Sequence, residues 1–178
     1  MGPELTADSP ARATTPSRRA RPIVVAAVVV VVLALIALRL WVFDIVTVAS
    51  GSMAPTLCAG DLVLVERVAP WQRLEHGDIV VFANPGDGSP TVKRVVGLPG
   101  EQVGIADAIL TVDGEFIDES YVDRATIDGV YFGPVEVPPD TVFVMGDARE
   151  FSIDSREFGA VPREDVSMRM LVNLSGCR

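Results

Sequence analysis

The chain has 178 residues, a formal net charge of −9 at pH 7 and 49% hydrophobic residues. This length allows one domain with small appendages, and the acidic balance excludes a typical nucleic-acid binder, because phosphate contacts need clustered lysine and arginine. With one histidine and two cysteines the chain cannot form a zinc site of any familiar pattern, and we expect no metal and no other cofactor.

Residues 1–21 are rich in proline, serine, threonine and arginine and contain few apolar side chains. Such a segment cannot bury a core, so we expect it to be disordered. The segment that follows, residues 22–43, begins with sixteen consecutive apolar residues at Ile23–Leu38. Its length approaches the ~20 residues that a helix needs to cross a bilayer, which predicts a transmembrane helix.

The charges on the two sides of this segment predict its orientation. Residues 1–43 hold five arginines and two acidic residues, a net charge of +3, which leaves −12 for residues 44–178. The positive-inside rule then places residues 1–21 in the cytoplasm and residues 44–178 outside the cytoplasmic membrane. A cleaved signal peptide is the alternative, but the apolar run exceeds the ~7–15 residues of a usual signal-peptide core, and we favour a retained anchor.

Short β-rich runs separated by Gly, Pro and Asp begin after residue 43. Ile79–Phe82 lacks polar alternation and predicts a strand buried on both faces, while Val112–Glu115, with its central Asp-Gly, predicts a hairpin. Residues 118–140 predict a long loop. The candidate strands are Ile45–Ala49, Asp61–Val68, Ile79–Ala83, Thr91–Gly97, Gln102–Ile105, Ile109–Val112, Thr141–Gly146 and Val166–Leu174. The fold class is mainly β, with two packed or partly closed antiparallel sheets in residues 44–178.

Lys93 is the only lysine, and the other fourteen basic residues are arginines. A buried lysine can lose its proton and act as a base, which arginine cannot do. Val92, Val95 and Val96 would desolvate Lys93 and lower its pKa from about 10.4 towards neutrality. The run Ser50–Leu57 (SGSMAPTL) offers a serine that could use this base, so the two features predict a Ser–Lys hydrolase. A surface ion pair and a flexible turn are the ordinary alternatives for each feature alone.

The single histidine and the two cysteines are less informative. His76 lies in a turn before a predicted strand and has no serine neighbour in sequence, so we interpret it as an exposed turn residue rather than a base. Cys58 and Cys177 permit one disulfide in an oxidising compartment, but the sequence contains no information on their Cα separation, and the pairing stays open.

Four runs, in this order, resemble the sequence boxes of bacterial type I signal peptidases, which are membrane-anchored and remove signal peptides from exported proteins. They are Ser50–Leu57 (SGSMAPTL), Gly77–Phe82 (GDIVVF), Lys93–Gly100 (KRVVGLPG) and Gly146–Arg156 (GDAREFSIDSR). The chain departs from the family at Ala148, Glu150 and Phe151, where Asn, Asp and Asn are common. None of these three matches a catalytic group, so the resemblance still implies a serine endopeptidase with a signal-peptidase-like antiparallel β domain.

The resemblance also implies roles for individual residues. Ser52 would be the nucleophile and Lys93 the general base, with the Ser50 hydroxyl and the Ser52 backbone N–H holding the oxyanion. Ser152 would hydrogen-bond the lysine and orient it. A structural ion-pair set is implied for Asp147, Arg149, Asp154 and Arg156. Apolar pockets that select small residues at −1 and −3 of the substrate would be lined by Val48, Ala49, Leu57 and Val92, although core packing explains Leu57 equally well.

The resemblance implies two partners, precursor proteins with signal peptides and the lipid bilayer. Only nine residues separate Phe43 from Ser52, about 30 Å when extended, so we expect the active site to lie at the membrane surface. Two alternatives remain open. One is another Ser–Lys peptidase of the same fold, such as a pilus-maturation enzyme or a self-cleaving repressor, although repressors are cytosolic and lack an anchor. The other is an inactive membrane-anchored binding domain, against which the presence of Ser52, Lys93 and Ser152 argues. The Ser-x-x-Lys pattern of penicillin-binding enzymes is absent.

Overall fold

The computed structural model describes residues 20–122 and 131–177, and the chain divides into two compact units at residues 40 and 41. Most of the N-terminal segment predicted to be disordered, residues 1–19, lies outside the described residues. Helix α1 (Ala20–Val42) begins two residues before the predicted span and ends one residue earlier than expected. Its part Pro22–Val42 has a mean hydropathy of 3.1 and is not buried, so it is long and apolar enough for a membrane anchor.

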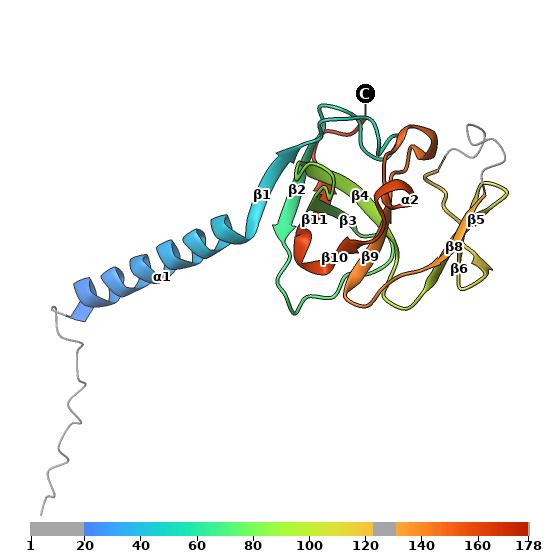
Figure 1. Cartoon of the computed structure of the whole chain (residues 1–178). Coiled ribbons are helices and arrows are strands. Elements are labelled where there is room, and N and C mark those ends of the chain that lie inside the picture. The colour runs from blue at the N-terminus through green and yellow to red at the C-terminus, as the bar shows by residue number, and fades with distance from the viewer. Residues whose placement is uncertain (1–19, 123–130, 178) are drawn as a thin grey trace, which may run out of the picture. The chain divides into compact units, whose positions relative to one another are not determined.

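The second unit contains, within the described residues, two antiparallel sheets (Figure 1). The larger sheet has the strand order β1 (Phe43–Thr47), β2 (Leu62–Arg67), β11 (Val166–Asn173), β3 (Ile79–Ala83), β4 (Pro90–Gly97), β9 (Thr141–Met145) and β10 (Val161–Pro162). The smaller sheet has the order β7 (Glu115–Phe116), β6 (Ile109–Val112), β5 (Gln102–Ala106) and β8 (Phe132–Glu136). The short helices are η2 (Arg149–Phe151), α2 (Ser155–Phe158) and η3 (Arg163–Asp165). The mainly β prediction is confirmed.

Local sequence signals explain several of these strands. The first four residues of β3 are all buried, as expected for a strand without polar alternation. The turn between β6 and β7 has positive φ at Asp113 and Gly114, which is the backbone that an Asp-Gly hairpin requires. All eight candidate strands occur, with ends that differ from the predicted ones by no more than two residues.

The prediction of a continuous loop over residues 118–140 is wrong in its C-terminal part. Strand β8 lies there and pairs with β5 in a register that places Val103 opposite Val135. Gly133 and Pro134 conceal this strand in the sequence, because both residues are rare inside sheets. β8 is the last strand of the smaller sheet, and an edge strand tolerates a proline, since that position does not need a second ladder of hydrogen bonds.

One core cluster matters most for the site, because it lies beneath the turn that carries Ser52. The segment between β1 and β2 contributes its apolar side chains to this cluster, and the strands β2 and β3 contribute the rest. The buried members are Val48, Met53, Leu57, Val63, Val65, Ile79 and Val81. Met53 and Leu57 are no more than 1% exposed, so the turn is held on the larger sheet by hydrophobic packing.

Candidate active site

Ser52 lies in the turn between β1 and β2, directly before the buried Met53. The turn is closed by the Ala54 N–H, which donates to the Gly51 carbonyl at 3.0 Å, and by the Leu57 N–H, which donates to the Met53 carbonyl at 2.9 Å. Ser52 itself is partly exposed, and Ser50 is exposed. The apolar side chains therefore anchor the turn and leave the serine hydroxyls at the surface.

Lys93 projects from β4, and its Nζ lies 2.7 Å from Ser52 Oγ. Lys93 is only 3% exposed, and on β4 it lies opposite the fully buried Val80 of β3. Burial lowers the pKa of Lys93 below the ordinary lysine value, and the positive charge of Arg156 acts in the same direction, whereas Asp154 and Asp147 oppose the change. A buried lysine with a lowered pKa is thus present beside the serine.

Ser50 adds a second hydroxyl to this group. Its Oγ lies 3.4 Å from Ser52 Oγ, within reach of the atom that would carry out the attack. The side chains of Ser50, Ser52 and Lys93 therefore meet at one place, although 41 residues separate Ser52 from Lys93. A nucleophile, a base and a hydroxyl donor in this arrangement can carry out acyl transfer.

The segment after β9 approaches the other side of the Ser52 turn. The Ala148 N–H donates to the Ser52 carbonyl at 3.1 Å. Gly146 makes this approach possible, because a Cβ atom at that position would lie 2.5 Å from the Ser52 carbonyl oxygen and 2.2 Å from Ser152 Oγ. Only glycine leaves room for this contact without a shift of the backbone.

Ser152 is buried in this segment, but its hydroxyl has no hydrogen-bond partner in the part of the chain that the structure describes. The hydrogen bond to Lys93 that we expected is not formed: the Ser152 side chain packs against Gly146, where a Cβ atom would otherwise lie, and Lys93 donates to Ser52 instead. A buried hydroxyl without a partner is uncommon in folded proteins, so this group requires an explanation.

The predicted ion-pair set is more extended than the sequence indicated. Asp154 and Arg156 pair with each other, with Nε and Oδ1 2.8 Å apart, and Asp154 also accepts the Gly146 N–H at 3.0 Å. The other two predicted members do not pair within the set. Asp147 instead accepts two hydrogen bonds from Arg94, at 2.9 and 2.6 Å.

Arg149, the remaining member, donates to Glu119 at 2.6 Å and to the Gly146 carbonyl at 3.1 Å. Glu119 also accepts a hydrogen bond from Tyr121, whose ring lies 3.9 Å from the guanidinium carbon of Arg94. Arg94 additionally donates to Thr56 in the serine turn at 3.3 Å. Sequence reasoning missed Arg94, Glu119 and Tyr121. Arg94 lies in the lysine run and could have been suspected, but no pattern pointed to the other two.

A cavity of about 320 Å³ adjoins Ser52 and Lys93, and both apolar and polar residues line it. Of the four residues that we expect in the substrate pockets, Val48, Ala49 and Val92 line this cavity, together with Val46 and Pro90. Leu57 does not line it. That side chain is fully buried in the cluster below the turn, so its role is core packing.

His76 lies away from this group of residues. Its Nε2 is 2.7 Å from Glu101 Oε2, and its side chain is 46% exposed. Its position agrees with the interpretation as an exposed turn residue.

Comparison with known proteins identifies what this chain resembles. Residues 21–173 match a family described as signal peptidase, peptidase S26. The chain is 37% identical over 152 residues to a probable signal peptidase I-2 of Synechocystis sp., covering 81% of this chain and 68% of that protein. It is 40% identical over 141 residues to signal peptidase I S of Bacillus subtilis, covering 74% and 75%. A crystal structure of a signal peptidase I from Enterococcus faecalis matches with a TM-score of 0.51 at 30% identity, covering 57% of this chain and 98% of that one.

Proposed function

The chain belongs to the signal peptidase family, peptidase S26, and we propose that it removes signal peptides from exported precursors with Ser52 as nucleophile and Lys93 as general base. The observation that carries this proposal is the 2.7 Å contact between Ser52 Oγ and the Nζ of a buried lysine. A base must lie within hydrogen-bond reach of the proton that it removes, and it must be neutral near the working pH. The 2.7 Å contact supports the first condition, and burial, which lowers the pKa of Lys93 below the ordinary lysine value, supports the second by favouring the neutral amine.

In the proposed mechanism, neutral Lys93 takes the proton of Ser52 as Oγ attacks the scissile carbonyl. The Ser50 hydroxyl, 3.4 Å from Ser52 Oγ, and the Ser52 backbone N–H would stabilise the developing oxyanion. Lys93 then returns the proton to the leaving amine, and the same lysine activates the water that hydrolyses the acyl-enzyme. One group thus serves first as base and then as acid in each half of the reaction.

Ser152 retains a proposed role as the residue that orients Lys93. Its hydroxyl is buried and has no partner among the described residues, which fits a group that forms its hydrogen bond when substrate is bound. Catalytic hydrogen bonds are often incomplete without substrate and tighten in the reacting complex.

We infer that the cavity beside the dyad selects small side chains at −1 and −3 of the precursor. In an extended peptide these two residues point to the same side, so both can face Val48, Ala49 and Val92. Strand β1 is at the edge of the larger sheet, and the chain that leaves it lines the cavity. A substrate strand can add to such an edge through backbone hydrogen bonds, which would orient the scissile bond.

The membrane is the second proposed partner. The arginines precede helix α1, and residues 44–178 are strongly acidic, so we infer that the peptidase domain lies outside the cytoplasmic membrane with α1 as a retained anchor. Substrate signal peptides lie in the same membrane, and the short connection between α1 and Ser52 would keep the nucleophile near the point where they emerge.

Cleavage by variants of the purified full chain tests this function. The chain in detergent is incubated with a precursor that carries a signal peptide, and the cut is mapped by mass spectrometry. Ser52→Ala and Lys93→Met should each remove nearly all activity, and the double variant should be little worse, because the two residues act as one unit. Lys93→Arg should be nearly as damaging, because arginine keeps its proton.

The matched control is Ser120→Ala, which removes an exposed hydroxyl outside the cavity and should retain full activity. Substantial cleavage by Ser52→Ala or Lys93→Arg would refute the proposed dyad. A cut elsewhere than the end of the signal peptide would favour a Ser–Lys peptidase of another pathway, and no cut by the parent chain would favour a binding domain.

A further inference from the structure

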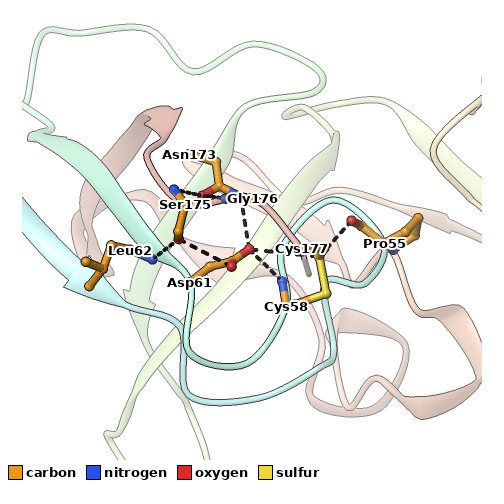
Figure 2. Close-up of a disulfide and its surroundings, with 8 residues drawn as sticks. All are labelled: Pro55, Cys58, Asp61, Leu62, Asn173, Ser175, Gly176 and Cys177. Carbon is orange, nitrogen blue, oxygen red and sulfur yellow. Dashed lines mark hydrogen bonds between the residues drawn. A yellow bond between two sulfur atoms is a disulfide. The ribbon is translucent and has the colours of Figure 1, made fainter.

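A disulfide joins the Ser52 turn to the segment that follows β11. Cys58, at the end of the turn, is bonded to Cys177 across 119 residues, with their Cα atoms 5.1 Å apart. Figure 2 shows the surroundings of this bond, where the sulfur of Cys177 also contacts the Pro55 carbonyl oxygen at 3.1 Å. The bond therefore reaches into the turn itself rather than to a distant part of the domain.

Asp61 organises the same region. It is 5% exposed and accepts hydrogen bonds from the Cys58 N–H and from Asn173 Nδ2, both at 3.0 Å (Figure 2). Ser175 Oγ adds a third at 3.3 Å. These hydrogen bonds, the one from the Cys58 backbone first, lower the pKa of Asp61 and keep its carboxylate charged. We call Cys58, Asp61, Asn173, Ser175 and Cys177 the clasp.

The clasp is connected to the substrate cavity through one pair of backbone hydrogen bonds. The Val48 N–H donates to the Asp61 carbonyl, and the Gly60 N–H donates to the Val48 carbonyl, each at 2.8 Å. Val48 lines the cavity and precedes Ser52 by four residues. These hydrogen bonds hold together the two ends of the segment from Val48 to Asp61, which contains Ser52. The clasp attaches these ends to the segment after β11.

We propose that the clasp positions Ser52 for attack, and that the Cys58–Cys177 disulfide is required for the full catalytic rate. This inference rests on the proposed function of Ser52. The opposite side of the turn is held by the Ala148 N–H and by Arg94, so the clasp completes a support from two directions. When the disulfide is absent, the turn gains freedom on one side only, and Ser52 Oγ loses its alignment with Lys93 while the fold persists.

The expected effect falls on kcat more than on KM. Residues 46–53, which the clasp supports through Val48, form the larger part of the cavity wall, and β4 supplies another part through Pro90, Thr91 and Val92. Because the β4 part of the wall does not depend on the clasp, substrate binding should change less than the geometry of attack. A displacement of about 1 Å at a reacting group costs about 10²-fold in rate, so a smaller shift of the turn should lower kcat roughly tenfold.

The test uses the full chain in detergent, as oxidised parent, as parent reduced with dithiothreitol, and as the Cys58→Ser/Cys177→Ser variant. Reduction transfers two electrons and two protons from the dithiol to the disulfide, giving two thiols and oxidised reagent. The reduced parent and the double variant should both lose kcat roughly tenfold with a smaller change in KM. Dithiothreitol should not affect the double variant.

A second readout separates positioning from general destabilisation. Lys93 is the only lysine, so isotope-labelled lysine gives one NMR signal that reports on the dyad. Below the melting temperature of each form, that signal should shift between oxidised and reduced parent if the clasp positions Ser52 against Lys93. A folded double variant with parental kcat and an unmoved lysine signal would overturn the proposal.

If the double variant does not fold, Asp61→Asn tests the clasp instead, because this variant keeps the disulfide. It weakens the hydrogen bonds from Cys58 and Ser175 and should lower kcat in the same direction, with its thermal unfolding measured in parallel. A folded Asp61→Asn chain with parental kcat would also contradict the clasp. Ser52→Ala distinguishes failure of the proposed function from failure of the clasp proposal. If Ser52→Ala cleaves like the parent, Ser52 is not the nucleophile, whatever the clasp variants do.

Discussion

Gly146 is the position where a single added methyl group should disable the site. Its Cβ in Gly146→Ala would lie 2.5 Å from the Ser52 carbonyl oxygen, and ordinary contact begins near 3.4 Å, so the two segments must separate by about 0.9 Å. The same atom would meet Ser152 Oγ at 2.2 Å and Ser152 Cβ at 2.5 Å. Because one of these atoms belongs to the backbone of Ser52 and the other two to the buried side chain of Ser152, the methyl group cannot be accommodated by the movement of one flexible side chain.

The magnitude follows from this displacement. A shift of about 1 Å at the nucleophile corresponds to roughly a 10²-fold loss of kcat. Overpacking of this kind also costs about 1–3 kcal/mol of stability, which leaves most chains folded at assay temperature. We therefore expect a Gly146→Ala chain that is folded, moderately destabilised and about 10²-fold slower.

The assay measures kcat on a precursor peptide and the free energy of unfolding by urea denaturation. Gly86→Ala is the matched control, since its Cβ would meet only the side-chain oxygen of Asn84, at 3.3 Å. That control should change stability by no more than about 0.5 kcal/mol and leave kcat unchanged. A Gly146→Ala chain with parental kcat and stability would refute the close packing of Gly146 against Ser52 and Ser152.

Three further predictions concern the base, the ion pairs and substrate choice. A lysine base works only when neutral, so kcat/KM should fall as pH drops through the pKa of Lys93. Because burial lowers that pKa, the acid limb of the profile should lie below the roughly 10.4 of a solvated lysine. A labelled Lys93 NMR signal that titrates like a solvated amine would contradict the mechanism. Glu119→Gln leaves the buried Arg149 without its charge partner and should lower the free energy of unfolding, measured by urea denaturation, by about 3–5 kcal/mol. Glu66→Gln, in the more exposed pair with Arg169, should lower it clearly less. Equal losses would show that burial of the pair does not set its contribution. Precursor peptides with Ala, Leu or Phe at −1 should be cleaved in that order of decreasing rate, and equal rates would exclude a selective cavity at Val48.

The orientation of the anchor is tested in cells. Protease added to intact spheroplasts should digest the domain that begins at residue 44, because the arginines precede α1 and the acidic charge follows it. Full protection of that domain would contradict the proposed topology, and a mature N-terminus mapped after residue 43 would contradict a retained anchor.

Much of this molecule is determined by signals that act over a few residues. Strand β3 follows from an apolar run, the β6–β7 hairpin from Asp113-Gly114, and the apolar helix from its length and composition. Lys93 is a candidate base from the sequence alone, because it is the only lysine in the chain and its neighbours are apolar. Such features depend on backbone preference and local burial, which the order of residues encodes directly.

Only the tertiary structure decided which distant groups meet. Arg149 lies 30 residues from Glu119, so the spacing could not select this pair. Cys58 lies 119 residues from Cys177, and the sequence left open whether these two cysteines meet. Packing likewise placed Leu57 in the core rather than in the cavity wall. A single sequence contains no record of these separations, because a contact between distant residues depends on how every intervening strand folds back. Several acidic residues could satisfy the same arginine, and two cysteines bond only if the fold brings their Cα atoms close enough.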